Sequence, residues 1–164
     1  MRKQRFLAQG AWYEVRTAIN NREPLFRRRQ AVAMFCRVFG EARKRFAFEL
    51  RGFRLEEEWL SFYIKPADGL QLPTIMQWLK QTFSVRFNLR RERSGHVWGD
   101  RYWSRVVEGE PPEEAGEVDW TAVDVAAETG VLPPSNGVSP LAAENPAKPC
   151  FSPQNPARSP PPPG

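Results

Sequence analysis

The chain has 164 residues, a length that suits one domain with a hydrophobic core better than two. Residues 1–107 carry 22 Lys and Arg against 10 Asp and Glu, a net charge of +12, whereas residues 108–164 carry 2 against 9, a net charge of −7. The second part also holds 13 of the 16 prolines. This composition predicts a basic folded domain over 1–107 and an acidic, proline-rich, mostly disordered tail over 108–164.

Composition also excludes several classes of protein. The basic N-terminus is followed by no long apolar run, so neither a signal peptide nor a transmembrane segment is predicted. The two cysteines, Cys36 and Cys150, are too few for a disulfide framework, and Cys36 falls on the apolar face of a predicted helix. We therefore expect a reducing, intracellular compartment and no membrane partner.

Hydrophobic periodicity predicts six elements in the basic domain. They are, in chain order, a strand over 11–18, a helix over about 28–46, a strand over 48–55 with a bulge or turn at Gly52, a central strand within 53–66, a helix over about 72–87 and a short strand over 102–107. This order is typical of an α+β, ferredoxin-like plate, a four-stranded antiparallel sheet with two helices on one face. In the tail, residues 119–128 favour one weak helix, and disorder is expected beyond Pro133.

The central strand has two different faces. Leu60, Phe62 and Ile64 are expected to face the core, so Trp59, Ser61 and Tyr63 are expected to point out of a free sheet face. Side chains at i and i+2 on one face are close enough to hold one metal ion or one scissile phosphate. A Trp indole has no lone pair for a metal, however, and a Ser hydroxyl is a poor ligand.

Basic runs interleaved with aromatic residues favour nucleic-acid binding, although each run alone is typical of a solvated surface. The aromatic residues Trp98, Tyr102 and Trp103 either stack on unpaired bases or cover the core. The predicted nucleic-acid-binding residues are Arg27, Arg28, Arg29, Arg90, Arg91, Arg93, His96, Trp98, Arg101 and Arg105.

Two features could be mistaken for catalytic groups. A lone histidine in a loop, His96, is more often structural than catalytic. Among the three consecutive glutamates that precede the central strand, Glu56 and Glu58 point to one face, yet a solvated turn is the favoured interpretation.

Three segments within residues 1–107 carry a resemblance to a known family: YEVRTAINNREPLF, MQWLKQTFSVRFN and RSGHVWGDRYWSRV. In them the chain resembles the single-tyrosine transposases of the HUH class, of the insertion-sequence-200-like and REP-associated type. The resemblance implies a bacterial mobile-element protein that nicks single-stranded DNA beside a hairpin during transposition. In such a protein, two histidines on the central strand hold Mg²⁺ or Mn²⁺, and a tyrosine on the second helix forms a 5′-phosphotyrosine link.

The chain departs from this family at the chemical positions. Aligned on the Ile-Lys-Pro that ends the central strand, Trp59 and Ser61 stand at both histidine positions. Phe83 stands at the tyrosine position and has no hydroxyl group. Arg86 stands three residues later, where the family carries a second aromatic residue, and it is no nucleophile. Tyr63 is a candidate substitute nucleophile. No family catalytic residue is intact, and we expect no bound metal or other cofactor.

The favoured reading is a transposase-like DNA-binding protein that is catalytically inactive, a pseudoenzyme in the bacterial cytoplasm associated with the nucleoid. Its expected partner is single-stranded or hairpin DNA, with RNA and a homodimer as open alternatives. The alternative function is an active metal-dependent DNA-nicking transposase that uses substitute ligands such as Glu56, Glu58 or His96. A third, weaker reading is an interaction protein whose proline-rich tail recruits a partner.

Overall fold

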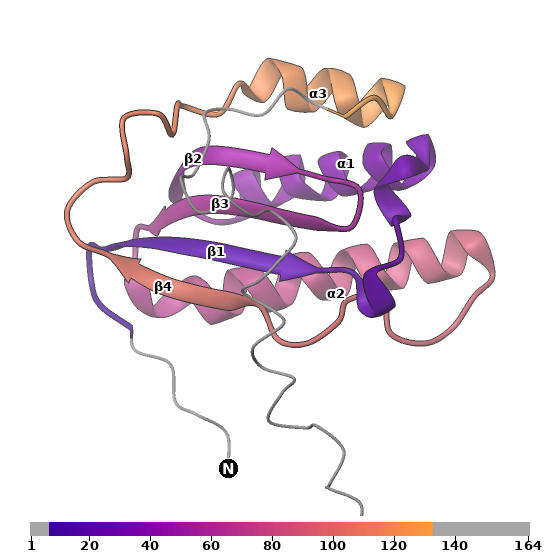
Figure 1. The fold of residues 1–164 in the computed structure, drawn as a ribbon, viewed down its shortest axis with the longest axis horizontal. Coiled ribbons are helices and arrows are strands. Elements are labelled where there is room, and N and C mark those ends of the chain that lie inside the picture. The colour runs from indigo at the N-terminus through magenta and orange to yellow at the C-terminus, as the bar shows by residue number, and fades with distance from the viewer. Residues whose placement is uncertain (1–6, 133–164) are drawn as a thin grey trace, which may run out of the picture.

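Four strands form one antiparallel sheet in the order β2-β3-β1-β4, and the structure, a computed structural model, describes residues 7–132. The elements are β1 (Trp12–Ala18), α1 (Arg29–Arg45), β2 (Phe48–Leu55), β3 (Trp59–Pro66), α2 (Leu72–Arg91), β4 (Trp103–Val107) and α3 (Trp120–Thr129), with 3₁₀ turns η1 (Asn20–Arg22), η2 (Leu25–Arg27) and η3 (Gly69–Gln71). Helices α1 and α2 cover one face of the sheet (Figure 1). The predicted α+β plate with two helices on one face is therefore confirmed.

The two long helices follow the predicted apolar spacing. In α1 the buried residues Val32, Phe35 and Phe39 recur every three or four positions, which is one face of a helix. Pro73 lies in the first turn of α2, where its missing N–H is not needed. The rings of Phe35 and Phe83 meet edge-on with centroids 5.6 Å apart and join α1 to α2. No helix within residues 7–132 has the length and apolarity needed to span a membrane.

Strand β2 carries the predicted bulge at Gly52. The register of β2 against β3 shifts between Arg51 and Arg54, and Gly52 has φ +61°, a conformation that favours glycine. A Cβ at this position would lie 3.0 Å from the ring of Tyr63. The Gly52 N–H, turned out of the ladder, donates to the Gly116 carbonyl oxygen at 2.9 Å. The bulge thus ties the chain beyond β4 to the edge of the sheet.

The second face of β3 is not free, and this expectation was wrong. Trp59, Ser61 and Tyr63 are only 5%, 2% and 2% exposed. Tyr63 packs with Trp12 of β1 and with Ala115, which belongs to the segment between β4 and α3. Two large rings on one sheet face bury much apolar surface, so covering them stabilises the fold.

Helix α3 packs on α1. Asp119 caps α3 by accepting a hydrogen bond from the Ala122 N–H at 3.1 Å, and the inner side of the helix is buried at Val123. Gly130 ends α3 with φ +73°, and a Cβ there would overlap the carbonyl group of Arg29 at the start of α1. The helix expected over 119–128 is therefore confirmed.

The described part of the predicted tail, residues 108–132, packs against the basic domain. Residues 108–132 contain eight Asp and Glu and no Lys or Arg, so the acidity of residues 108–164 is concentrated in this packed part. The division of the chain at residue 107 stays a prediction. The disorder expected beyond Pro133 falls outside the described residues.

Candidate nucleic-acid interface

The two positions that the resemblance assigns to metal-binding histidines lie between arginines. Arg16 of β1 and Arg54 of β2 are the strand neighbours of Ser61 on its two sides. The guanidinium of Arg54 lies 5.7 Å from the centroid of the Trp59 ring, and that of Arg16 lies 5.6 Å from the centroid of the Trp103 ring. The side chains around these two positions are therefore guanidinium groups and indole rings.

Arg16 belongs to a buried ionic group that the sequence analysis missed. Glu14 and Arg16 are only 1% and 3% exposed, and Arg16 donates to the Glu14 carboxylate at 2.7 Å. Arg105 of β4 donates to the other carboxylate oxygen of Glu14 at 2.8 Å. The i, i+2 spacing of Glu14 and Arg16 in β1 was the available signal, because it places both on one face.

These residues do not fit a divalent cation. The Trp59 indole offers no lone pair, and the positive charges of Arg16 and Arg54, the strand neighbours of Ser61, disfavour a further cation. Glu14, the buried carboxylate nearby, is already bound by two guanidinium groups.

Phe83 lies on the other side of the sheet from Trp59 and Ser61. It belongs to α2 and is fully buried in the core between α2 and α1, with the ring centroids of Trp98 and Phe87 each 5.6 Å away. Trp59 and Ser61 point to the opposite sheet face, because they alternate with the core residues of β3. The three family positions therefore do not converge in one chain.

The substitute groups proposed from the sequence also lie apart or have partners. Arg54 donates to Glu56 at 2.7 Å, and Arg22 lies 3.8 Å from Glu58. His96 is exposed in the loop between α2 and β4. Within residues 7–132, no group of three or more His, Cys, Asp or Glu side chains is placed to hold a metal ion.

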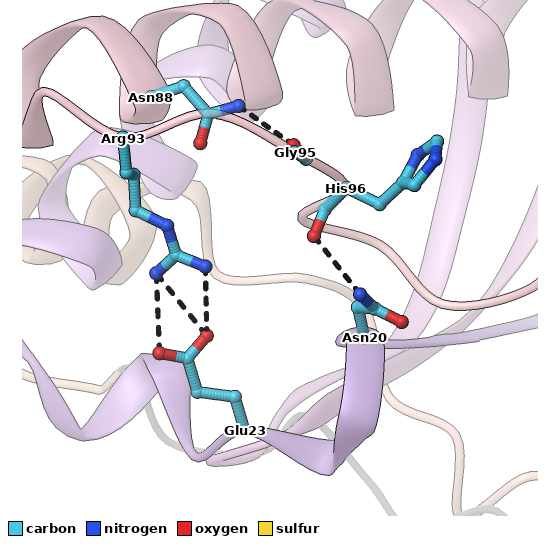
Figure 2. A network of polar contacts seen from close by, with 6 residues as sticks. All are labelled: Asn20, Glu23, Asn88, Arg93, Gly95 and His96. Atoms are coloured by element: carbon cyan, nitrogen blue, oxygen red, sulfur yellow. Dashed lines mark hydrogen bonds and ion pairs between the residues drawn. The ribbon is translucent and has the colours of Figure 1, made fainter.

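Three loops meet at one end of the sheet, where α1 begins and α2 ends (Figure 1). Figure 2 shows Arg93, just beyond α2, directed at Glu23 of the β1–α1 loop, with nitrogen–oxygen distances of 3.3–3.4 Å. The amide of Asn20 donates to the His96 carbonyl oxygen at 3.4 Å. The β2–β3 turn joins them, because the Phe26 N–H donates to a carbonyl oxygen of that turn at 2.9 Å.

The predicted basic residues divide into two groups. Three are held by carboxylates: Arg27 by Glu57 at 2.9 Å, Arg93 by Glu23 and Arg105 by Glu14. The second group makes no ion pair or side-chain hydrogen bond to another residue in the described part of the chain; it consists of Arg28, Arg29, Arg90, Arg91 and Arg101. All five are exposed.

Two of these unpaired cations occupy unfavourable positions. Arg28 and Arg29 lie at the start of α1, where the helix dipole disfavours positive charge and no acidic residue occupies the first turn. Helix stability does not account for them. Arg90 and Arg91 lie at the end of α2, where the dipole favours them.

Trp98 is not available to stack on bases. It is 6% exposed, its indole N–H donates to the Lys80 carbonyl oxygen at 3.0 Å, and its ring packs on Phe35 and Phe83. Tyr102 is also buried, at 8% exposed. Both side chains therefore cover the core of the domain.

Comparisons with known proteins agree with the observed fold. The family model described as "Transposase IS200 like" matches residues 8–117. Among solved structures the chain is similar to a REP-associated tyrosine transposase bound to a REP hairpin, with a TM-score of 0.56 and 13% identity over 67% of this chain and 64% of that one. This likeness concerns the fold alone, and the chain spans less than two thirds of that transposase.

A second similar structure comes from Deinococcus radiodurans R1, a protein provisionally named a transposase. Its TM-score is 0.48, with 16% identity over 66% of this chain and 87% of that one. A search of curated proteins finds no match to this sequence.

Proposed function

The chain belongs to the IS200-like transposase family, and from this premise we propose that it is a DNA-binding protein that has lost the family's cleavage chemistry. The observation that carries the loss is the ionic group at Arg16, the strand neighbour of Ser61. Arg16 is buried next to Ser61 in the sheet and its guanidinium is bound to Glu14, so this position contributes a positive charge where the family's chemistry needs neutral metal ligands. Trp59 and Ser61 supply no ligand set in its place.

DNA binding is supported by the charge of the domain and by the exposed arginines where α1 begins and α2 ends. Residues 1–107 carry a net charge of +12, and five exposed arginines, four of them at the start of α1 or the end of α2, have no carboxylate partner among the described residues. A phosphate backbone is the complementary ligand for such a surface. The transposase of similar fold is bound to a REP hairpin, and we propose that single-stranded or hairpin DNA is also the partner here.

The test is a binding and cleavage experiment on the same DNA. A fluorescently labelled hairpin with single-stranded flanks is titrated with protein over a range of salt concentrations, and log affinity is expected to fall linearly with log salt, by about 0.7 per neutralised phosphate for single strands. Parallel samples with Mg²⁺ or Mn²⁺ are resolved under denaturing conditions. No shortened strand and no covalent protein–DNA adduct are expected.

Two outcomes would contradict this proposal in different ways. Affinity that is independent of salt would refute phosphate-based binding. A metal-dependent adduct would refute the loss of chemistry and favour substitute ligands such as Glu56, Glu58 or His96. RNA of the same sequence, as a competitor, tells whether the partner is restricted to DNA.

A further inference from the structure

The face of the sheet that points away from α1 and α2, called the sheet face, carries several arginines that bind carboxylates. Arg16 and Arg105 bind Glu14, and Arg54 binds Glu56. Arg51, on the same face, lies 3.4 Å from Glu110. The guanidinium groups of these arginines already contact carboxylates, so a phosphate would have to displace a protein partner.

The sheet face is also covered by acidic chain. Ala115 packs on Trp12 and Tyr63, and Glu117 forms a β-bridge with Arg51. Residues 108–119, which include Glu110 and Glu117, contain six acidic residues and no basic residue. A polyanion approaching this face would meet like charge.

The end of the domain where α1 begins and α2 ends, called the helix end, has arginines without carboxylate partners among the described residues. Two adjoining hollows of about 230 and 320 Å³ lie along α1 and share Met34, Arg37 and Arg90. The first lies between α1, the end of α2 and α3, which contributes one carboxylate, Glu128, and the second lies between α1 and α2. Arg29 lines the first hollow and Leu89 the second. Arg29 and Arg90 have no ion-pair partner in the described part of the chain, and Leu89 is 79% exposed.

The two hollows together form the α1–α2 groove, and the mixture of side chains that line it points to one kind of ligand. Arg29 and Arg90 can bind phosphates, whereas the Arg37 guanidinium also donates to the Ala127 carbonyl oxygen at 3.1 Å. Met34 and Leu89 offer apolar contact that a phosphate alone does not use. Unpaired bases expose apolar faces, and guanidinium planes also stack on them. A duplex hides those faces inside its stack, so a single strand fits the groove better.

We propose that single-stranded nucleic acid lies in this α1–α2 groove, with its phosphates on Arg29 and Arg90 and a base against Leu89. The inference rests on the proposed binding function and adds its location, on the helix side of the domain and away from the sheet face.

The experiment compares two charge-matched double variants of the full chain. Arg29→Gln with Arg90→Gln removes two groove cations. Lys44→Gln with Arg45→Gln removes two exposed cations at the other end of α1, about 22 Å from Arg29 at 1.5 Å per residue. Each protein is titrated into a fluorescently labelled single strand, and circular dichroism confirms that each is folded.

The groove variant is expected to lower the salt slope by about 1.4, two phosphate contacts at about 0.7 each. At a salt concentration of about 0.1 M this corresponds to a loss of affinity of about 25-fold. The control variant is expected to change affinity by about twofold at most, because its charges line neither hollow and lie about two Debye lengths from Arg29. Duplex DNA is expected to show a smaller difference between the two variants.

Each contrary result has its own meaning. Equal losses for the two variants, with a parent that binds, would overturn the groove and leave the proposed function standing. A parent that binds no strand would overturn both. Displacement of the strand by polyglutamate at equal concentrations of charge would show that the groove takes acidic polypeptide, which would also overturn the inference.

A second measurement does not depend on the folding of a variant. Phenylglyoxal modifies accessible guanidinium groups, and mass spectrometry locates the products. Bound single strand is expected to protect Arg29 and Arg90 and to leave Arg45 modified. Protection of Arg45 alone would contradict the proposed location.

Discussion

The sheet face and the helix end of this domain both gather arginines, but they use them differently. On the sheet face Arg16, Arg54 and Arg105 bind carboxylates, and Glu14 and Arg16 are buried. At the helix end Arg29 and Arg90 are exposed and line a groove without such partners among the described residues. A count of arginines does not distinguish the two regions. Pairing and burial do, because a paired guanidinium holds the fold together and an unpaired one remains available to a ligand.

The largest expected effect concerns the buried ionic group. Arg16→Met removes one of the two guanidinium groups that bind Glu14, and breaking a buried pair costs about 3–5 kcal/mol of unfolding free energy. Urea denaturation of parent and variant measures the difference. We expect single-strand affinity of the folded fraction to be unchanged, since Arg16 lies outside the groove.

The double variant Glu14→Gln with Arg16→Met provides the control. It removes both charges together, so it is expected to recover most of the lost stability. A double variant as unstable as Arg16→Met alone would mean that packing, and not charge, explains the effect.

The second prediction concerns metal binding on the sheet face. Trp59→His with Ser61→His restores the spacing of the family's ligands, and truncating the buried Trp59 costs about 3 kcal/mol. We expect no Mn²⁺ binding while Arg16 remains, because its guanidinium repels the ion. Adding Arg16→Gln is expected to produce measurable affinity, read by titration calorimetry or by the electron paramagnetic resonance of free Mn²⁺.

The same series tests the place of the nucleophile. Adding Phe83→Tyr is expected to give no nicking even when Mn²⁺ binds, because residue 83 lies across the sheet from residues 59 and 61. Mn²⁺ affinity in the two-histidine variant with Arg16 present would contradict the electrostatic argument. Nicking after Phe83→Tyr would contradict the placement.

A smaller effect is expected at the edge of the groove. Glu128 of α3 lines the hollow that contains Arg29 and Arg90, so it opposes a bound phosphate. Glu128→Gln is expected to raise single-strand affinity by about two- to fivefold at low salt, since one unit of opposing charge is removed. Glu113→Gln, an equal charge change in the segment beyond β4, serves as control. An equal gain in both variants would mean that net charge alone acts.

The smallest effect is a dependence of stability on pH. The Arg86 guanidinium donates two hydrogen bonds to Glu41, each of 2.8 Å, and lowers the pKa of that carboxyl below 4.5. A lowered pKa in the folded state stabilises the protein fully above the unfolded pKa, and this stability is lost as the pH falls through the folded value. Both side chains are over one third exposed, so the contribution is about 0.5 kcal/mol at neutral pH.

Arg86→Gln is therefore expected to lower stability slightly at pH 7 and by less at pH 3, because protonation of Glu41 weakens the interaction as the pH falls. Thermal denaturation at the two pH values measures this. A difference that persists undiminished at the lower pH would assign the effect to packing of the Arg86 stem.

Much of the fold could be read from local patterns. The apolar spacing of α1 and α2, the alternation in β3 and the glycine at the bulge are properties of short stretches, and the structure has each of them. The alternation of residues also predicted which side chains of β3 face the helices. It could not predict that Trp59, Ser61 and Tyr63 are buried, because their neighbours include side chains on other strands and on the chain beyond β4.

The candidate site was predictable in composition and only partly in arrangement. The basic runs indicated phosphate binding, and five of the ten predicted residues are exposed arginines without a carboxylate partner in the described part of the chain. The sequence did not show that Glu23 would bind Arg93 or that Trp98 would be buried. Partners 70 residues apart leave no local signal.

The sequence by itself determined the order of elements, the basic charge of the domain and the replacement of the family's histidines by Trp59 and Ser61, because these are properties of residue identity and short-range spacing. Only the tertiary structure decided which arginines remain available and that residue 83 lies across the sheet from residues 59 and 61. Ion pairs and sheet faces depend on strands and loops that are distant in sequence. Their energies therefore take effect only once the chain has brought those segments together.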